Sequence, residues 1–102
     1  MFNIIARRTL LEFCRIYPEA AQALMEWYHE LIGKDFRNFQ ELKETYKGCS
    51  IVGDDRVVFN IAGNKFRLVV RVVFQFKTIQ VKWFGTHKEY DKIDVKSIQF
   101  KK

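Results

Sequence analysis

The alternation of residues in the segment 65–76, KFRLVVRVVFQF, constrains the fold of this chain more than any other feature. Large apolar side chains recur at every second position, which is the period of a β-strand. The apolar side consists of Phe66, Leu68, Val70, Val72, Phe74 and Phe76. The other side consists of Lys65, Arg67, Val69, Arg71, Val73 and Gln75. This pattern predicts an antiparallel sheet that packs on helices with one face and carries basic residues on the other.

Turn signals on both sides of this strand predict its neighbours. They lie at Ala62-Gly63-Asn64 and around Lys77-Thr78. We therefore expect an antiparallel meander with strands at 56–61, 65–76 and 78–84. Unbroken alternation in the last strand places Gln80, Lys82 and Phe84 on one side and Ile79, Val81 and Trp83 on the other.

The first part of the chain has the signals of two long helices. Thr9 with Glu12 matches a capping box, which predicts a helix from about Leu10. Pro18 suits the first turn of a second helix, because the missing N–H of proline has no partner to lose there. Gly33 is expected to end this second helix.

A third, short helix completes the prediction of the fold. Asn38 with Glu41 can cap a helix that runs to about Tyr46. The apolar segment from Phe2 to Ala6 fits a first strand. We expect an α+β fold, with two N-terminal helices and a short third helix packed on a twisted antiparallel β-sheet. The length of 102 residues predicts one domain that spans residues 1–102.

The net charge of +6 is unevenly distributed along the chain. Residues 1–48 hold seven basic and seven acidic residues, whereas residues 49–102 hold eleven basic and five acidic residues. The whole excess of positive charge therefore lies in the half that contains the predicted sheet. Such an asymmetry favours a polyanionic partner, although a basic residue pattern can also serve solubility alone.

Composition argues against several other classes of protein. The chain has two cysteines, Cys14 and Cys49, without a CxxC motif, so it predicts neither a disulfide framework nor a zinc site. We expect no metal and no cofactor. The start of the chain lacks the apolar run of a signal peptide, and no segment approaches the length of a membrane span. These features predict a cytoplasmic protein without a membrane partner.

Residues near the end of the last strand have the chemistry needed to cleave RNA without a metal. The reaction needs proton transfer at the 2′-hydroxyl and at the departing 5′-oxygen, and cations for the charged phosphate oxygens. His87 can transfer protons, Tyr90 follows it closely, and Arg67 and Arg71 supply positive charge. A surface histidine and solvated strand charges would show the same pattern.

Four segments of the chain together resemble the RelE/ParE superfamily of bacterial toxins. VVFNIAGNKFRLVVRV and GTHKEYDKI look like the HigB-type branch, whose members are mRNA interferases. RRTLLEF and ALMEWYHE, which lie earlier in the chain, also fit this branch. The resemblance thus covers nearly the whole chain in the right order.

The resemblance implies a toxin of a type II toxin–antitoxin system that cuts translated mRNA in the ribosomal A site. It implies a cognate antitoxin with a helix-turn-helix domain, and through that antitoxin an indirect association with operator DNA. We expect Lys88, Lys96, Lys101 and Lys102 to contact ribosomal RNA. Such contacts should weaken strongly with salt.

Carried over residue by residue, the resemblance implies catalytic roles for Arg67, His87 and Tyr90. Binding of RNA phosphates is assigned to Lys65, Arg71, Lys82 and Lys92. Some related toxins use Lys, Arg and Tyr without a histidine, so the identity of the general base stays open. Two alternatives also stay open. One is a ParE-like toxin that poisons DNA gyrase, and the other is a non-catalytic, basic RNA-binding domain.

Overall fold

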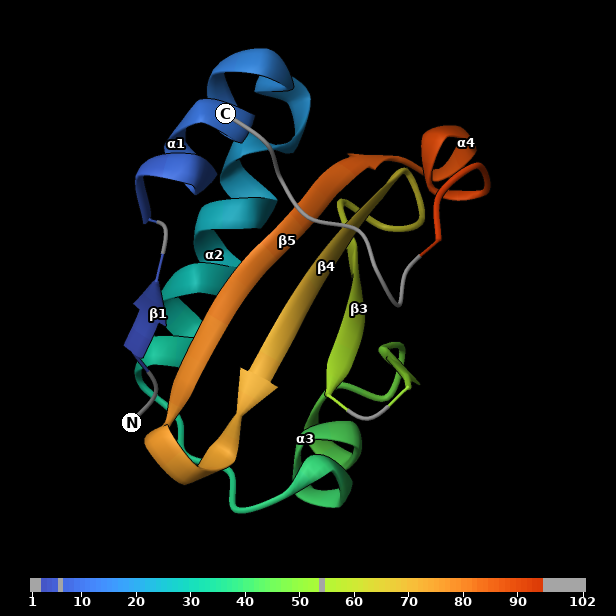
Figure 1. Ribbon diagram of the computed structural model, residues 1–102. Coiled ribbons are helices and arrows are strands. Elements are labelled where there is room, and N and C mark those ends of the chain that lie inside the picture. Colours follow the sequence, from blue (N-terminus) through green and yellow to red (C-terminus); the bar gives the residue numbers. More distant parts are fainter. Residues whose placement is uncertain (1–2, 6, 54, 95–102) are drawn as a thin grey trace.

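Helices occupy most of the first half of the chain and strands most of the second half (Figure 1). The computed structural model describes residues 3–5, 7–53 and 55–94. Its elements are, in chain order, β1 (Asn3–Ile5), α1 (Arg7–Ile16), the 3₁₀ turn η1 (Pro18–Ala20), α2 (Ala21–Ile32), α3 (Phe39–Thr45), β2 (Ser50–Val52), β3 (Arg56–Ile61), β4 (Phe66–Val73), the 3₁₀ turn η2 (Phe74–Phe76), β5 (Thr78–Thr86) and α4 (His87–Tyr90).

The strands form one sheet with the order β1-β5-β4-β3-β2. β2, β3, β4 and β5 are antiparallel neighbours, which confirms the predicted α+β fold and the predicted meander. β1 adds a parallel strand beside β5, with Asn3 opposite Thr78. The strand expected at the N-terminus is therefore present, and its sequence did not indicate which strand it would join. Phe2 and Ala6, the expected ends of that strand, lie outside the described residues.

α1 and α2 cover one face of the sheet, behind the strands in the view of Figure 1. The buried residues of this inner face come from all the long strands: Val57, Phe59, Ile61, Phe66, Leu68, Val70, Val72, Ile79, Val81 and Phe84. They pack against helix residues that are equally buried, namely Leu10, Phe13, Leu24, Trp27, Leu31 and Leu42. Burial of this apolar surface is the main source of stability. Among residues 3–5, 7–53 and 55–94, no helix covers the opposite, outer face of the sheet.

A β-bulge in β5 changes the face on which its last residues lie. Val69 is opposite Trp83, but the next residue, Val70, is opposite Val81, so Lys82 is an extra residue on β5. The predicted unbroken alternation of this strand is therefore wrong beyond Lys82. Phe84 lies on the inner face, where its ring stacks on Phe66 with a centroid distance of 5.4 Å. Trp83 consequently lies on the outer face.

The predicted helix signals are confirmed at α3 and at α2 but not at α1. The Asn38 side chain accepts a hydrogen bond from the Glu41 N–H, as a cap of α3 should. η1 begins at Pro18, and Gly33 is the C-cap of α2. α1 begins at Arg7, before the expected start, and Thr9 is buried inside it. Thr9 is therefore a packed residue and not the cap. None of the helices in the described part of the chain is long and apolar enough to cross a membrane.

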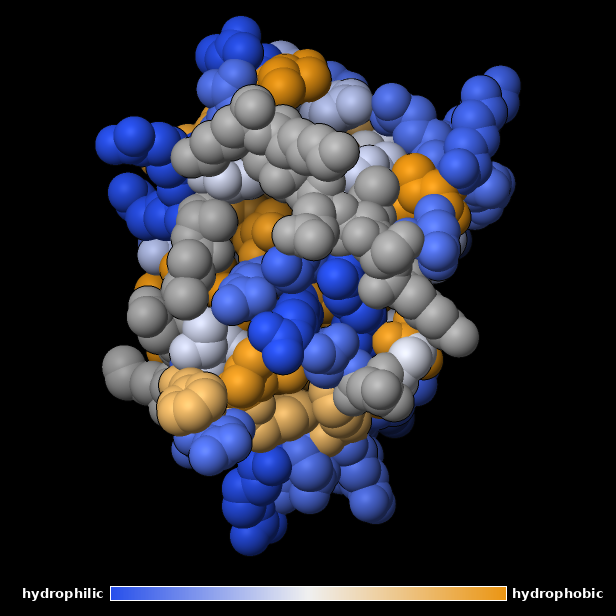
Figure 2. Space-filling model, in the orientation of Figure 1, coloured by the Kyte–Doolittle hydropathy of each residue, from blue (hydrophilic) through white to orange (hydrophobic). Residues whose placement is uncertain are grey.

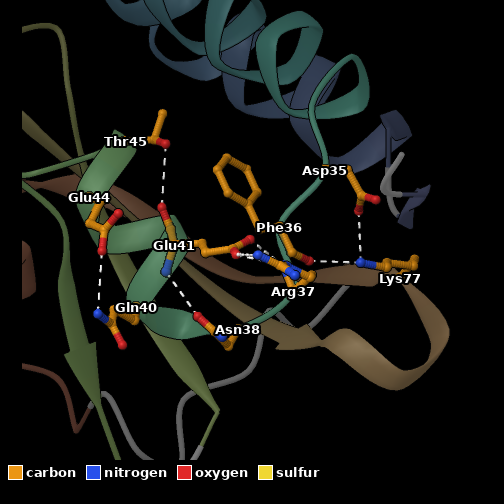
Figure 3. Close-up of polar contacts among 9 residues, drawn as sticks. All are labelled: Asp35, Phe36, Arg37, Asn38, Gln40, Glu41, Glu44, Thr45 and Lys77. Atoms are coloured by element: carbon orange, nitrogen blue, oxygen red, sulfur yellow. Dashed lines mark hydrogen bonds and ion pairs between the residues drawn. The ribbon is translucent and has the colours of Figure 1, made fainter.

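β4 is shorter than the predicted strand 65–76, so its connection to β5 is longer than expected. β4 ends at Val73, and a 3₁₀ turn follows in which Phe76 is 70% exposed. Lys77 completes the turn with a φ of 48°, and its Nζ donates to the Phe36 carbonyl at 2.7 Å and contacts Asp35 at 2.7 Å (Figure 3). These contacts fasten the turn to the segment between α2 and α3.

Candidate active site

The outer face of the sheet carries the basic residues of β4 and β5. Figure 2 shows that hydrophilic residues gather over the middle of this face. Arg67 and Arg71 lie on it, half-buried, at two positions four residues apart in β4. At the rise of a strand this separation is about 13 Å. The face thus has two basic clusters, one at the end of β4 where His87 lies and one at the other end.

The pairing of β4 with β5 brings three of the predicted residues together. Arg67 is directly opposite Gly85, two residues before His87. The His87 N–H donates to the Lys65 carbonyl at 3.0 Å, so the first residue of α4 is tied to the residue that precedes β4. Lys65, Arg67 and His87 therefore meet at one corner of the sheet because of the strand register, although they are up to 22 positions apart in the sequence.

The guanidinium of Arg67 is oriented by neutral groups. Its Nη1 donates to the carbonyl of Asn64 at 3.1 Å and to the carbonyl of Phe66 at 3.1 Å. These two bonds hold the side chain beside the β3–β4 turn. Because carbonyl oxygens carry no formal charge, the bonds fix the position of the guanidinium without neutralising it, and its remaining N–H groups can donate to an anion.

α4 is a single turn that is held by a complete capping box. The Thr86 hydroxyl accepts from the Glu89 N–H at 3.2 Å, and Glu89 Oε1 accepts from the Thr86 N–H at 2.9 Å. Tyr17 donates its phenolic hydrogen to the same Oε1 at 3.0 Å, and its ring packs edge-on against Phe66 and Phe84. Glu89 therefore connects α4, and with it His87, to the hydrophobic core.

The Glu89 cap should make stability depend on pH. The hydrogen bond from the Thr86 N–H is the largest of the contacts that lower the pKa of Glu89 from its ordinary value of 4.5. Because the folded pKa is the lower one, the cap contributes fully above the unfolded pKa and is lost as the pH falls through the folded pKa. The difference in melting temperature between the native protein and Glu89→Gln should therefore be largest above pH 5, and should shrink as the pH falls below 4.5.

Glu44→Gln removes the same charge at an exposed position in α3 and serves as the control. Its melting temperature should follow that of the native protein across this range. If the difference in melting temperature between the native protein and Glu89→Gln is the same at pH 7 and at pH 3, the role of the ionised cap is contradicted.

His87 is more than half exposed and has a carboxylate close to its ring. Its Nε2 lies 3.8 Å from Asp91 Oδ1, one turn further along the chain, and 54% of its side chain is accessible to solvent. Asp91 can attract the ring electrostatically when the ring carries a proton, and hold it on this side of α4. The sequence does not by itself indicate Asp91 as a site residue, although the spacing of four residues would indicate the contact once α4 is known to be helical.

Tyr90 lies beside an aromatic residue that the sequence had assigned to the core. The rings of Tyr90 and Trp83 are 6.3 Å apart between centroids, with an interplanar angle of 50°. Both are partly exposed, and both border the corner formed by Lys65, Arg67 and His87. The unbroken alternation expected for the strand placed Trp83 on the inner face. Its position on the outer face could not be predicted, because the bulge at Lys82 has no clear signal in the sequence.

Arg71 and Lys82 form the second basic cluster, away from His87. Arg71 Nε donates to Asp55 Oδ2 at 2.5 Å, which partly neutralises its charge. Burial lowers the pKa of Lys82, and the neighbouring positive charges of Arg56 and Arg71 lower it further, while Asp55 acts in the opposite direction. The structure therefore separates these two predicted phosphate-binding residues from the catalytic candidates.

The remaining predicted cations surround α4 or lie beyond it. Lys88 and Lys92 are exposed on α4 and on the turn that follows it. Lys96, Lys101 and Lys102 lie outside the described residues. Within residues 3–5, 7–53 and 55–94, no group of three or more His, Cys, Asp or Glu side chains is arranged to hold a metal ion.

The chain is similar in sequence to known toxins. A family model for HigB toxins, described as the RelE-like toxic component of a toxin–antitoxin system, matches residues 20–93. The chain is 26% identical over 91 residues to the mRNA interferase toxin HigB of Escherichia coli K12, and the alignment covers 87% of this chain and 88% of the relative. The mRNA interferases HigB of Escherichia coli O157:H7 and of Shigella flexneri show the same identity and coverage.

Proposed function

Because the chain belongs to the HigB family of RelE-like toxins of toxin–antitoxin systems, we propose that it is an endoribonuclease that cleaves mRNA during translation. Its similarity to proteins named mRNA interferases supports this activity. The observation that carries the proposal is the corner of the sheet where the β4–β5 register places Arg67 opposite Gly85, two residues before His87. A fixed cation and a proton-transfer group side by side are what RNA cleavage needs in the absence of a metal.

The proposed reaction is attack by the ribose 2′-oxygen on the adjacent phosphorus. A P–O bond forms to the 2′-oxygen and the P–O bond to the 5′-oxygen breaks, which leaves a 2′,3′-cyclic phosphate and a free 5′-hydroxyl. His87 transfers one of the two protons that move, with Asp91 close to its ring. Arg67 stabilises the negative charge on the phosphate oxygens, and Tyr90 positions the reacting nucleotide. Lys65 and Lys92 add positive charge around this corner.

The proposed setting is the ribosomal A site, where the ribosome presents the mRNA and Lys88 contacts ribosomal RNA. Arg71 and Lys82 hold RNA phosphates further along the outer face, outside the catalytic corner. A cognate antitoxin with a helix-turn-helix domain restrains the toxin and brings it indirectly to operator DNA. The toxin acts in the cytoplasm, because its substrate is translated there.

Mapping of mRNA 5′ ends after induction tests this function. Native protein should produce new 5′ ends within reading frames, and His87→Gln should reduce their yield by about 10²-fold or more, since general acid–base catalysis contributes roughly 10²–10⁴-fold. His29→Gln is the matched control, because His29 is the only other histidine and lies exposed on α2. This control should cleave as the native protein does.

The same experiment separates the two alternatives. Chromosome breakage with intact transcripts would contradict the proposal and indicate a gyrase poison. RNA binding that is unchanged by His87→Gln, together with an absence of new 5′ ends for the native protein, would indicate a non-catalytic RNA-binding domain.

A further inference from the structure

Trp83 lies on the outer face of the sheet only because of the β-bulge at Lys82. Its cross-strand partner is Val69, which is buried and belongs to the outer face of β4. A large aromatic ring can cover a buried neighbour and still present part of its surface to solvent. Trp83 is partly exposed, so covering Val69 does not account for the whole of its ring.

The absence of a side chain at Gly85 determines where the indole lies. A Cβ added to Gly85 would stand 2.6 Å from Trp83 Cη2 and 2.7 Å from Trp83 Cζ2. The benzene ring of the indole therefore occupies the space above the Gly85 backbone, lying along β5 toward α4. This close approach requires glycine, since real Cβ atoms essentially never come within 3.0 Å of another heavy atom.

This position places the indole next to the proposed catalytic cation. Gly85 is directly opposite Arg67, and side chains at opposite positions of antiparallel strands have their Cβ atoms about 5 Å apart. The indole fills the place of the side chain that would stand opposite Arg67. The ring of Tyr90 is 6.3 Å away, so the indole lies close both to Tyr90 and to the position opposite Arg67.

We propose that Trp83 is the surface on which a base of single-stranded RNA stacks beside the scissile phosphate, an inference that rests on the proposed endoribonuclease function. An aromatic face next to a fixed cation is how proteins hold an unpaired nucleotide, with the base on the ring and the phosphate on the cation. Trp83 thereby sets the distance of the ribose from Arg67 and His87. It is a positioning residue that takes no part in proton transfer.

The proposal is tested by comparing the binding of RNA that has its bases with the binding of RNA that lacks them. Two oligomers of equal length are titrated at low salt, a single-stranded oligoadenylate and an oligoribonucleotide whose nucleotides are all abasic. Trp83→Leu should weaken binding of the oligoadenylate by about 10-fold, because stacking contributes roughly 1–3 kcal/mol per base. It should leave binding of the abasic oligomer within about twofold. Trp83→Phe keeps an aromatic face and should retain most of the affinity for the oligoadenylate.

Intrinsic fluorescence gives a second readout in the same titration. Trp83 and Trp27 are the only tryptophans, and Trp27 is only 4% exposed. Oligoadenylate should quench the fluorescence of the native protein, and this quenching should disappear in Trp83→Phe. Equal binding of both oligomers by the native protein, failure of the native protein to bind either, or unchanged oligoadenylate binding by Trp83→Leu would overturn the proposal.

Gly85→Ala moves the indole without removing it and should reproduce the loss seen with Trp83→Leu. Because its Cβ would also stand 3.1 Å from Glu89 Oε1, the melting temperature is recorded to detect any change in the α4 cap. Gly33→Ala is the matched control, because a Cβ there would meet its nearest neighbour at 3.5 Å, an ordinary contact distance. Base-dependent binding by a native protein that yields no RNA cleavage would contradict the endoribonuclease function and leave the stacking role of Trp83 standing. Failure of one proposal can thus be told from failure of the other.

Discussion

Arg67→Ala should lower the rate of RNA cleavage by about 10²–10³-fold while the protein remains folded. This is the typical cost of removing one preorganised donor from the charge that develops in a transition state. The side chain is held by two carbonyl oxygens, so its position is set before RNA binds. The measurement is the rate of mRNA cleavage on programmed ribosomes, with the melting temperature recorded for each variant.

Arg71→Ala provides the matched control for charge and strand position. Arg71 lies on the same strand and the same face, but it pairs with Asp55 and is separated from His87 by the length of β4. Its replacement should lower the apparent affinity for RNA several-fold and leave the maximal rate nearly unchanged. Equal loss of maximal rate in the two variants would show that the positive charge of the face matters and the position of Arg67 does not.

Phe84→Ala should cost about 3–5 kcal/mol of unfolding free energy, the usual range for a buried phenylalanine. Phe84 is 5% exposed, and its ring packs against Phe13, Tyr17 and Phe66. A domain of this size has roughly 5–15 kcal/mol in total, so the melting temperature should fall on the order of 15 °C. Thermal or denaturant unfolding measures the change.

Phe76→Ala is the control for the same chemical change at an exposed position. Phe76 is 70% exposed in the turn between β4 and β5, so its replacement should change stability by about 0.5 kcal/mol or less. The unbroken alternation expected for β5 would instead place Phe84 on the outer face and Trp83 in the core. A small effect of Phe84→Ala would therefore contradict the bulge at Lys82.

The parts of the fold that depend on local patterns could be predicted from the sequence. The alternation from Phe66 to Val73 predicts β4 because one face of the sheet is buried, and Asn38 predicts the start of α3 because its side chain caps a backbone N–H. Thr9 misled the prediction of α1. A capping box can occur by chance, and the helix is stabilised by the burial of Leu10 and Phe13 whichever residue begins it.

Features that depend on tertiary contacts could not be predicted. The bulge at Lys82 adds one residue to β5, and a single added residue moves every later side chain to the other face. Because of that shift, the predicted faces of Trp83 and Phe84 are the reverse of the observed ones. The sequence could propose Arg67, His87 and Tyr90 as one group, but only the strand register separates them from Arg71 and Lys82. The helical turn of α4 brings Asp91 near the histidine.

The parallel pairing of β1 with β5 has a consequence for the order in which the protein is made. Asn3 is synthesised long before its partner on the sheet, Thr78, and the residues opposite Arg67 and around His87 are made later still. Contacts between such distant residues form only after the intervening chain is complete, and closing so long a loop has a high entropic cost. A nascent chain that has not yet reached Thr86 therefore lacks both the closed sheet and the corner where Lys65, Arg67 and His87 meet.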